Sequence, residues 1–235
     1  MIPVPTPLLL ARRSARSGAL AGLVLALAMT GCTRDEPAVD KTANSGTDAT
    51  PAPEAGPVEA IVRTEHGDFR FELRPDVAPI ACANFVNLVQ RGFYDGLEFY
   101  RHSRVIRQTG NPWNDEAQRW DCGYRFMPEF SPDLRFDRGG MVALTRLVDD
   151  VASPVRPNEF FVTTKPQSER FTFTYPIFGV VLDGQDVVNA MPEGTVIRTI
   201  ELVGDPSPLL APYADAVAVW NEALDRAADP RQTSP

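Results

Sequence analysis

Short segments with alternating apolar residues dominate residues 58–204 of this 235-residue chain. The stretch EAIVRTEHGDFRFEL contains two alternating runs around the turn residues His66 and Gly67, a pattern that predicts a β-hairpin. Further β-type segments follow at FYRHSRVIRQTGNP, GGMVALT, NEFFVTT, YPIFGVVLDG and TVIRTIELVG. Short strands separated by turn signals are typical of all-β domains, so the sequence predicts a mainly β fold, either a closed barrel or a sandwich.

Three other segments have the pattern of helices. PIACANFVNLVQRG carries apolar residues at helical spacing between Pro79, which suits a first turn, and Gly92, which ends the pattern. QDVVNAM predicts a shorter helix, and these two helices would cap the barrel. PYADAVAVWNEALDRAADP, after Gly204, predicts a C-terminal amphipathic helix with an acidic outer face. This last helix either packs on the barrel or docks a partner.

Residues 1–31 have the layout of a secretory signal peptide. Arginines precede the apolar run GALAGLVLALAM, which is shorter than the ~20 residues needed to span a bilayer. The run stops at MTGC, and a small residue followed by Cys32 resembles the lipobox of bacterial lipoproteins, whose cysteine is lipidated. We expect Cys32 to be lipidated; the alternatives are an uncleaved anchor or a misassigned start.

Residues 32–57 predict a disordered tether rich in proline, alanine and acidic residues, because they contain almost no large apolar side chain. The expected organisation is a signal peptide at 1–31, the tether at 32–57, a globular domain at 58–204 and a C-terminal extension with one helix at 205–235. A lipid anchor would hold the domain in the bacterial cell envelope, facing the periplasm. Thr33 after the cysteine favours the outer over the inner membrane.

Charge and composition exclude several functional classes. The net charge is −8 and would become −11 without the three arginines of residues 1–31, which argues against nucleic-acid binding. Neither His66 nor His102 has cysteines at zinc-binding spacing, so no metal or other cofactor is expected. Cys82 and Cys122 would either pair as a disulfide in an exported protein or remain two buried thiols.

The ordered set of motifs resembles the cyclophilin family of peptidyl-prolyl isomerases. The matching segments cover about residues 58–203 and are VRTEHGDFRFELRPDVAPIACANFVNLVQRGFYDGLEFYR, QTGNP, GYRFMPEF, LRFDRGGMVALT, NEFFVTT and IFGVVLDGQDVVNAM. The resemblance implies an eight-stranded closed barrel with two capping helices and peptidyl-prolyl cis-trans isomerase activity. It also implies that the partners are proline-containing segments of unfolded exported proteins. We expect a monomer.

The resemblance assigns site residues position by position. Arg101 matches the catalytic arginine, Gln108 the glutamine that orients it, and Phe161 the phenylalanine under the proline pocket. The implied substrate-binding residues are Val105, Ile106, Thr145, Arg146, Glu159, Phe171 and Tyr175. Each catalytic candidate also has a plainer interpretation, as a surface arginine, a buried amide or a core residue. Of Phe160 and Phe161, only one can face the groove, since successive strand residues point to opposite faces.

Several positions depart from the family pattern. The chain is one residue shorter between Arg101 and Gln108, which predicts a bend at 102–104. Glu159 stands where the family has glutamine; pairing with Arg101 would hold that guanidinium away from substrate, unless Arg146 takes up the charge. The other departures are Thr145–Arg146 for an Ala-Asn pair, and Arg170 or Phe171 for a rim tryptophan.

Three classes of function are compatible with these residues. The first is a lipid-anchored isomerase, favoured by Arg101, Gln108 and Phe161. The second is a proline-peptide binding module with little catalysis, an envelope chaperone or scaffold, favoured by the substituted groove residues. The third is a structural lipoprotein without a groove, which the retained groove positions disfavour. We expect the enzyme, with weak activity.

Overall fold

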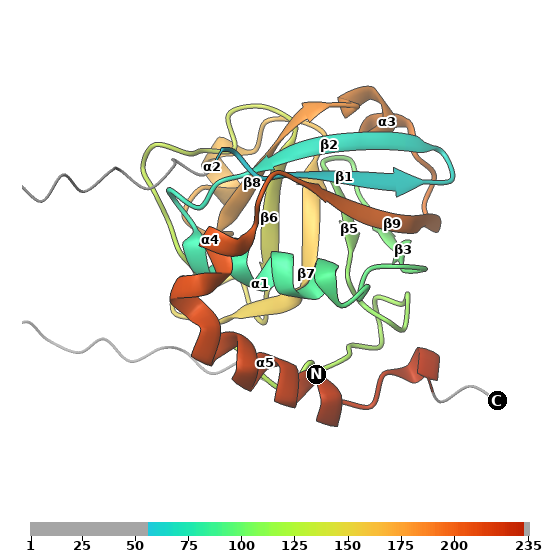
Figure 1. The fold of residues 1–235 in the computed structure, drawn as a ribbon. Helices are drawn as coiled ribbons and strands as arrows, with labels where there is room; N and C mark the ends of the chain where they lie inside the picture. Colours follow the sequence, from blue (N-terminus) through green and yellow to red (C-terminus); the bar gives the residue numbers. More distant parts are fainter. Residues whose placement is uncertain (1–55, 233–235) are drawn as a thin grey trace, which may run out of the picture. The chain divides into compact units, whose positions relative to one another are not determined.

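The computed structural model describes residues 56–232 (Figure 1). The predictions for residues 1–55, including lipidation of Cys32, lie outside this range. The strands are β1 (Glu59–Thr64), β2 (Gly67–Leu73), β3 (Glu98–Phe99), β4 (Arg101–His102), β5 (Ile106–Thr109), β6 (Met141–Arg146), β7 (Val155–Thr163), β8 (Ile177–Asp183) and β9 (Thr195–Val203). The helices are α1 (Pro79–Gln90), α2 (Ser168–Phe171), α3 (Gln185–Ala190), α4 (Ser207–Leu210) and α5 (Ala214–Arg226), with 3-10 turns at Ala211–Tyr213 and Pro230–Gln232.

The strands form an antiparallel, nearly closed barrel in the order β3-β9-β1-β2-β8-β6-β7-β5-β4. Strands β3 and β4 are the two edges of this order, and only Tyr100 separates them in the chain. Because β3 pairs with β9 and β4 pairs with β5, one short segment joins the two edges. The mainly β barrel is therefore confirmed. The sheet has nine strands rather than eight within the described residues, because this segment changes partner at Tyr100.

The predicted hairpin of β1 and β2 is confirmed, with Thr64 opposite Gly67 at its turn. The segment from Phe99 to Pro112 is not one extended run as the sequence suggested. It breaks into β3, β4 and β5, and the turn between β4 and β5 is closed by the Ser103 N–H, which donates to the Ile106 carbonyl oxygen at 3.1 Å. The bend therefore lies one residue beyond the expected 102–104.

Two hydrophobic clusters lie on opposite faces of β6 and β7. Val142, Leu144, Phe160 and Val162 point into the main core inside the barrel. Met141, Ala143 and Phe161 alternate with them along the strands and belong to a second, smaller cluster on the outer face. These two strands are therefore buried along almost their whole length, and the smaller cluster forms the base of the groove described below.

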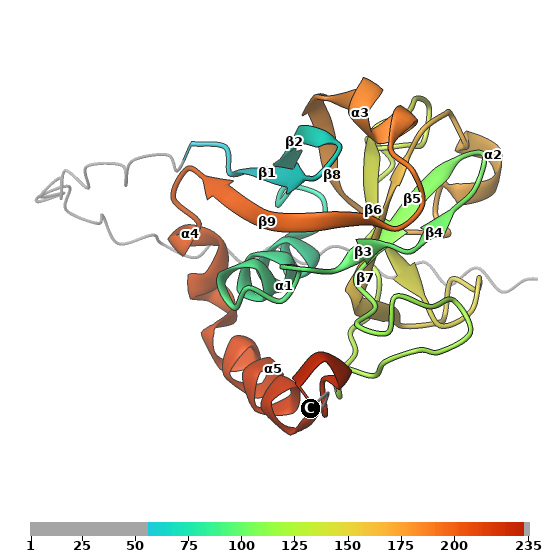
Figure 2. The same cartoon turned by 90° about the vertical axis from the view of Figure 1, so that its right-hand side faces the viewer.

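Helices α1 and α3 lie on opposite sides of the barrel, as the two capping helices predicted (Figures 1 and 2). Pro79 starts α1, and the carboxylate of Glu129 accepts hydrogen bonds from the N–H groups of Ile80 and Ala81 at 3.1 and 3.0 Å. These bonds satisfy two of the free donors at the helix N-terminus, where negative charge is favourable. Gly92, with a φ of +65°, ends the helix in the left-handed conformation that favours glycine.

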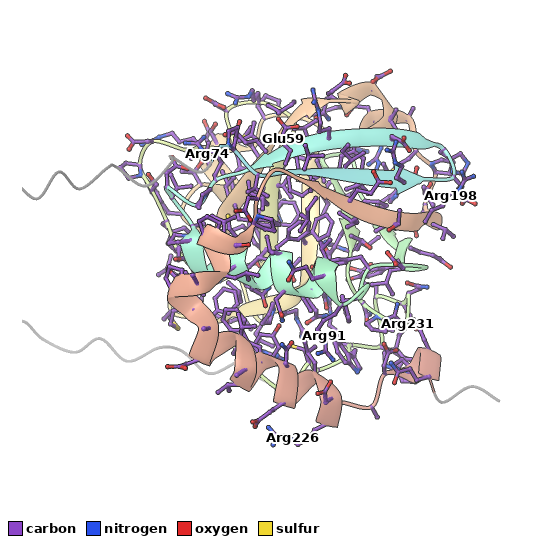
Figure 3. All side chains as sticks on the ribbon, viewed as in Figure 1. Glu59, Arg74, Arg91, Arg198, Arg226 and Arg231 are labelled. Atoms are coloured by element: carbon purple, nitrogen blue, oxygen red, sulfur yellow. The ribbon has the colours of Figure 1, made fainter. Side chains whose placement is uncertain are left out.

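The C-terminal helix packs on the domain, the first of the two alternatives. Helix α1 lies between the barrel and α5 (Figure 2). Trp220 of α5 is buried and stacks on Tyr124 with ring centroids 5.7 Å apart. Arg91 and Arg231, labelled in Figure 3, add polar contacts on this side: Arg91 pairs with Asp225, and Arg231 donates to the Phe93 carbonyl oxygen at 3.1 Å.

Tyr124, whose ring stacks on Trp220 of α5, is also hydrogen-bonded to α1. Its hydroxyl donates to Asn84 Oδ1 at 2.6 Å in a buried environment. Replacement of Tyr124 by phenylalanine would leave that oxygen without a donor, so we expect a loss of about 1–3 kcal/mol in the free energy of unfolding. Urea unfolding would measure it. An unchanged midpoint would show that this bond does not contribute.

Cys82 and Cys122 are free, buried thiols, so the disulfide alternative was wrong. Each sulfur lies 3.4 Å from a backbone carbonyl oxygen, that of Phe178 and that of Tyr124 respectively. Burial raises the pKa of the Cys82 thiol well above its usual range, so it stays protonated and unreactive. Across residues 56–232, the helices are too short or too polar to cross a membrane.

Candidate functional site

The pairing register brings the three catalytic candidates into one row. Arg101 on β4 lies opposite Gln108 on β5, which lies opposite Phe161 on β7, which in turn lies opposite Ala143 on β6. Residues directly opposite each other in antiparallel strands project from the same face of a sheet. The register therefore places a guanidinium, an amide and an aromatic ring side by side on the outer face of the barrel, although 60 residues separate the first from the last.

Two anchors hold the guanidinium of Arg101. Its Nη1 donates to Gln108 Oε1 at 3.0 Å, and its Nε lies 2.6 Å from Glu116 Oε1. Among the described residues, Nη2 has no hydrogen-bond partner, and the side chain of Arg101 remains 36% exposed at the groove. The guanidinium is thus fixed in orientation while one nitrogen stays available to a ligand.

The orientation of the Gln108 amide is determined by its neighbours. Its Nε2 donates both hydrogens, to the Tyr100 hydroxyl at 2.5 Å and to Glu159 Oε2 at 3.0 Å. Because a carboxylate can only accept, the amide nitrogen must face Glu159 and the amide oxygen must face Arg101. Gln108 is therefore both a satisfied buried amide and the residue that orients Arg101; the two interpretations describe the same contacts.

Glu159 is completely buried and does not line the groove, so its assignment to substrate contact was wrong. Its Oε2 also accepts from the Tyr100 hydroxyl, and it lies 3.1 Å from Arg119 Nη1. Its Oε1 lies 3.6 Å from Arg156 Nη1. The register does point Glu159 to the groove face, two residues before Phe161, but Arg119 covers it. Within residues 56–232 it forms no ion pair with Arg101 or Arg146.

The loop at 111–121 supplies both Glu116 and Arg119. Gly110, with a φ of +99°, turns the chain out of β5, and a Cβ there would lie 1.9 Å from the Asn158 carbonyl oxygen. The side chain of Asn111 then ties the loop, since its Nδ2 donates to the carbonyl oxygens of Asp115 and Gln118 at 2.7 and 2.6 Å. A glycine and the two hydrogen bonds of the Asn111 amide thus position the groove residue Arg119 and the Arg101 partner Glu116.

The base of the groove is the smaller hydrophobic cluster. Phe161 is 2% exposed, and Tyr175 and Phe171 meet its ring edge to face at 5.2 and 5.7 Å between centroids. The groove encloses about 310 Å³. Its lining includes the predicted residues Arg101, Val105, Ile106, Gln108, Thr145, Arg146, Phe161, Phe171 and Tyr175, so the structure brings together every predicted site residue except Glu159 and Cys32.

Arg107 has a structural role. Its guanidinium donates to the carbonyl oxygens of Ser103 and Asn189 at 2.8 and 2.9 Å, which links the β4–β5 turn to α3. The sequence did not single out Tyr100, Glu116 and Arg119, because nothing along the chain shows that they converge on Gln108, Arg101 and Glu159. Tyr100 carried one available signal, since it stands in the strand segment immediately before Arg101.

His102 makes the stability of this region depend on pH. Its Nε2 is buried and has no hydrogen-bond partner among the residues that the structure describes, and burial together with the nearby Arg107 cation lowers the pKa of His102 to about 4. The unfolded chain binds a proton first, so the free energy of unfolding should fall as the pH drops from about 6.5 to about 4. Denaturant unfolding across this range should be less pH-dependent in His102→Gln. Identical slopes for both proteins would contradict the assignment.

A family model described as cyclophilin type peptidyl-prolyl cis-trans isomerase matches residues 60–206. That range contains all nine strands but for the first residue of β1, and every residue that lines the groove. The chain belongs to the cyclophilin family. Its reaction is therefore peptidyl-prolyl cis-trans isomerisation, which the resemblance implied.

Individual relatives of this cyclophilin support the same conclusion. Peptidyl-prolyl cis-trans isomerase cyp15 of Rhizopus delemar is 34% identical over 151 residues, which are 62% of this chain and 23% of that protein. Peptidyl-prolyl cis-trans isomerase-like 1 of the same organism is 33% identical over 136 residues, 57% of this chain and 79% of that protein. A crystal structure of a cyclophilin type isomerase from Cryptosporidium parvum superposes with a TM-score of 0.57 at 25% identity, covering 64% of this chain and 99% of that one.

Proposed function

We propose that this cyclophilin isomerises X–Pro bonds with Arg101 as its catalytic residue and Phe161 as the base of its proline pocket. The observation that carries this assignment is the anchored guanidinium. Gln108 and Glu116 hold two of its nitrogens, and among residues 56–232 Nη2 has no hydrogen-bond partner, in a groove whose base is the smaller hydrophobic cluster. Gln108 acts as the positioning residue of Arg101 and, from its place in the groove lining, also as a contact for substrate.

An arginine suits this reaction because of what happens to the prolyl nitrogen. Amide resonance gives the bond a barrier of ~18–20 kcal/mol, and uncatalysed isomerisation takes tens to hundreds of seconds. In the twisted transition state that resonance is lost, and the nitrogen regains a lone pair that accepts a hydrogen bond. A donor aimed at this nitrogen binds the transition state more strongly than either ground state, which is the requirement for catalysis. Arginine stays protonated and presents its donors in a rigid plane.

The position of Glu159 supports the enzyme over the binding module. The binding-module hypothesis rested on the substituted groove residues. The main one was Glu159, whose carboxylate was expected to pair with Arg101 and hold it away from substrate. That carboxylate instead interacts with Arg119, Arg156 and Gln108. It thereby holds the amide that orients Arg101. Glu116 does pair with Arg101, but through Nε, which leaves Nη2 for the substrate.

Isomerisation of an X–Pro peptide by the purified full chain tests this proposal. Exchange NMR would measure the cis–trans rate with and without protein, and we expect clear acceleration over the uncatalysed rate. A folded protein that shifts the peptide resonances without accelerating exchange would instead establish the binding module. A folded protein that neither binds the peptide nor accelerates its exchange would support the third class, a structural lipoprotein without a groove.

We further propose that this cyclophilin is a monomeric, lipid-anchored envelope protein that assists the folding of exported proteins. The signal-like residues 1–31 and the MTGC segment ending at Cys32 support the anchor, and Thr33 supports the outer membrane. In a bacterial host, the full chain should incorporate labelled fatty acid and fractionate with membranes. Cys32→Ser should do neither. Equal labelling of both proteins would exclude Cys32 as the lipidation site.

A further inference from the structure

The groove is lined by more positive than negative side chains. The cations are the guanidinium groups of Arg101, Arg119, Arg146 and Arg170, and the lining contains one carboxylate, that of Asp149. The whole chain has a net charge of −8, so this local excess runs against the overall charge. A concave site that concentrates one sign of charge attracts ligands of the opposite sign.

Two of the four cations are neutralised by close partners. Arg101 lies 2.6 Å from a carboxylate oxygen of Glu116, and Arg119 lies 3.1 Å from one of Glu159. Both guanidinium groups are held in position by these carboxylates, so a bound peptide would meet little of their positive charge.

Arg146 and Arg170 have no carboxylate within 4.0 Å among residues 56–232. Arg146 is 6% exposed, and its Nη1 donates to the Thr174 carbonyl oxygen at 2.6 Å, while Nη2 donates to that of Ser153. Its buried Nε has no hydrogen-bond partner within the described part of the chain. Carbonyl groups satisfy hydrogens but do not cancel the charge. Arg170 is exposed, with its guanidinium 5.9 Å from the ring centre of Phe171.

This charge is a property of this chain rather than of the family pattern. Arg146 stands where the resemblance places asparagine, and Arg170 lies at or next to the position of a rim tryptophan. The carboxylate of Asp149 accepts a hydrogen bond from the Tyr175 hydroxyl, but it keeps its charge and offsets one of the two arginines. Because the lining sets two such guanidinium groups against one carboxylate, the uncompensated charge of the groove is positive.

We propose that this groove selects X–Pro segments that carry an acidic side chain within about three residues of the proline. The inference rests on the proposed function, in which the proline ring sits on Phe161. Arg146 follows Ala143, the partner of Phe161, by three residues of β6, which is about 10 Å along the strand. The guanidinium of Arg170 lies over the ring of Phe171, and this ring contacts Phe161 at the base of the groove. An extended peptide covers that distance in about three residues.

Peptides that differ in one charge would test this preference. We would measure kcat/KM of the full chain by exchange NMR for short peptides with Glu, Gln or Lys at each of the three positions before proline, and for a second series varied at each of the three positions after it. In one series at least, we expect the Glu peptide to exceed the Lys peptide by about fivefold or more at low salt. The ratio should shrink at about 0.5 M salt, where charges more than a few ångströms apart are screened.

Variants assign the preference to its residues. Arg170→Gln should lower the Glu-to-Lys ratio by about twofold or more, and Arg146→Gln should lower it as well. Arg226→Gln is the matched control, since it removes the same charge from the exposed surface of α5 (Figure 3) and should leave the ratio unchanged. Arg170 is exposed, so its substitution should not impair folding even if that of Arg146 does.

The outcomes separate this inference from the proposed function. Ratios within twofold of one in both series, a preference for the Lys peptides, or a preference that survives both groove variants would overturn the selection of acidic segments. Failure to accelerate the neutral Gln peptides would count against the isomerase assignment. Peptide affinities from NMR titration would then still decide the charge preference, because binding requires no turnover.

Discussion

Replacement of Arg101 by alanine is expected to lower kcat/KM for X–Pro isomerisation by about 100- to 1,000-fold, the usual effect of removing a donor aimed at a transition state. The loss should lie in kcat rather than in substrate binding, because the prolyl nitrogen accepts a hydrogen bond only when the bond is twisted. Stability should change by less than about 1 kcal/mol, since the pair with Glu116 is solvent-exposed. Exchange NMR and urea unfolding measure the two quantities separately.

Arg101→Lys is the matched control for charge. Lysine keeps the cation but lacks the planar set of donors that lets Arg101 bond Gln108 and Glu116 while presenting a third nitrogen. We therefore expect Arg101→Lys to recover only part of the lost activity. Activity above one tenth of the wild-type value in Arg101→Ala would remove Arg101 from the catalytic role, provided that the variant remains folded.

Replacement of Glu159 by alanine should destabilise the protein by about 3–5 kcal/mol, because it leaves a buried cation without its partner. The side chain of Arg156 is 11% exposed and lies 3.6 Å from Glu159, so it cannot reach bulk water easily. Gln108 and Tyr100 would also lose their shared acceptor. For a domain of this size the expected fall in Tm is about 10 °C, measurable by differential scanning calorimetry.

Glu159→Gln distinguishes lost charge from lost shape. It keeps an oxygen able to accept from Gln108 Nε2, so its Tm should fall less than that of Glu159→Ala. Its activity should not exceed that of the wild type, because Glu159 orients Gln108 and does not contact Arg101. A rise in activity would contradict the placement of Glu159 behind the amide. An unchanged Tm in Glu159→Ala would contradict the buried ion pair.

Local sequence patterns predicted most of the helices and strands of the fold. The alternation in β1 and β2 predicted their hairpin, and Pro79 and Gly92 mark the first and last turns of α1 in both sequence and structure. The segment after Phe99 was harder, because an extended pattern does not show that a strand breaks and changes partner. Tyr100 separates β3 from β4 only because β3 pairs with β9 whereas β4 pairs with β5.

The row of candidate catalytic residues was accessible through the family resemblance, whereas the residues that support it were not. Arg101, Gln108 and Phe161 stand in short motifs that can be compared one by one, and the register then aligns them. Arg119 comes from a loop with little secondary structure, whose course depends on Gly110 and Asn111. For this reason the sequence could not show that Glu159 pairs with Arg119, and it suggested instead that Glu159 would pair with Arg101.

The sequence by itself determined a mainly β fold with capping helices, because periodicity and turn residues are local properties of the chain. The ordered motifs added, through the family resemblance, the closed barrel and the candidates Arg101, Gln108 and Phe161. Only the tertiary structure decided which partner each charge has. Glu159 pairs with Arg119 and Arg156, and Arg101 pairs with Glu116, while the Arg146 guanidinium donates to backbone carbonyl oxygens and lies over the Phe130 ring. Electrostatic partners depend on distances of a few ångströms between residues that are distant in sequence, and folding alone sets those distances.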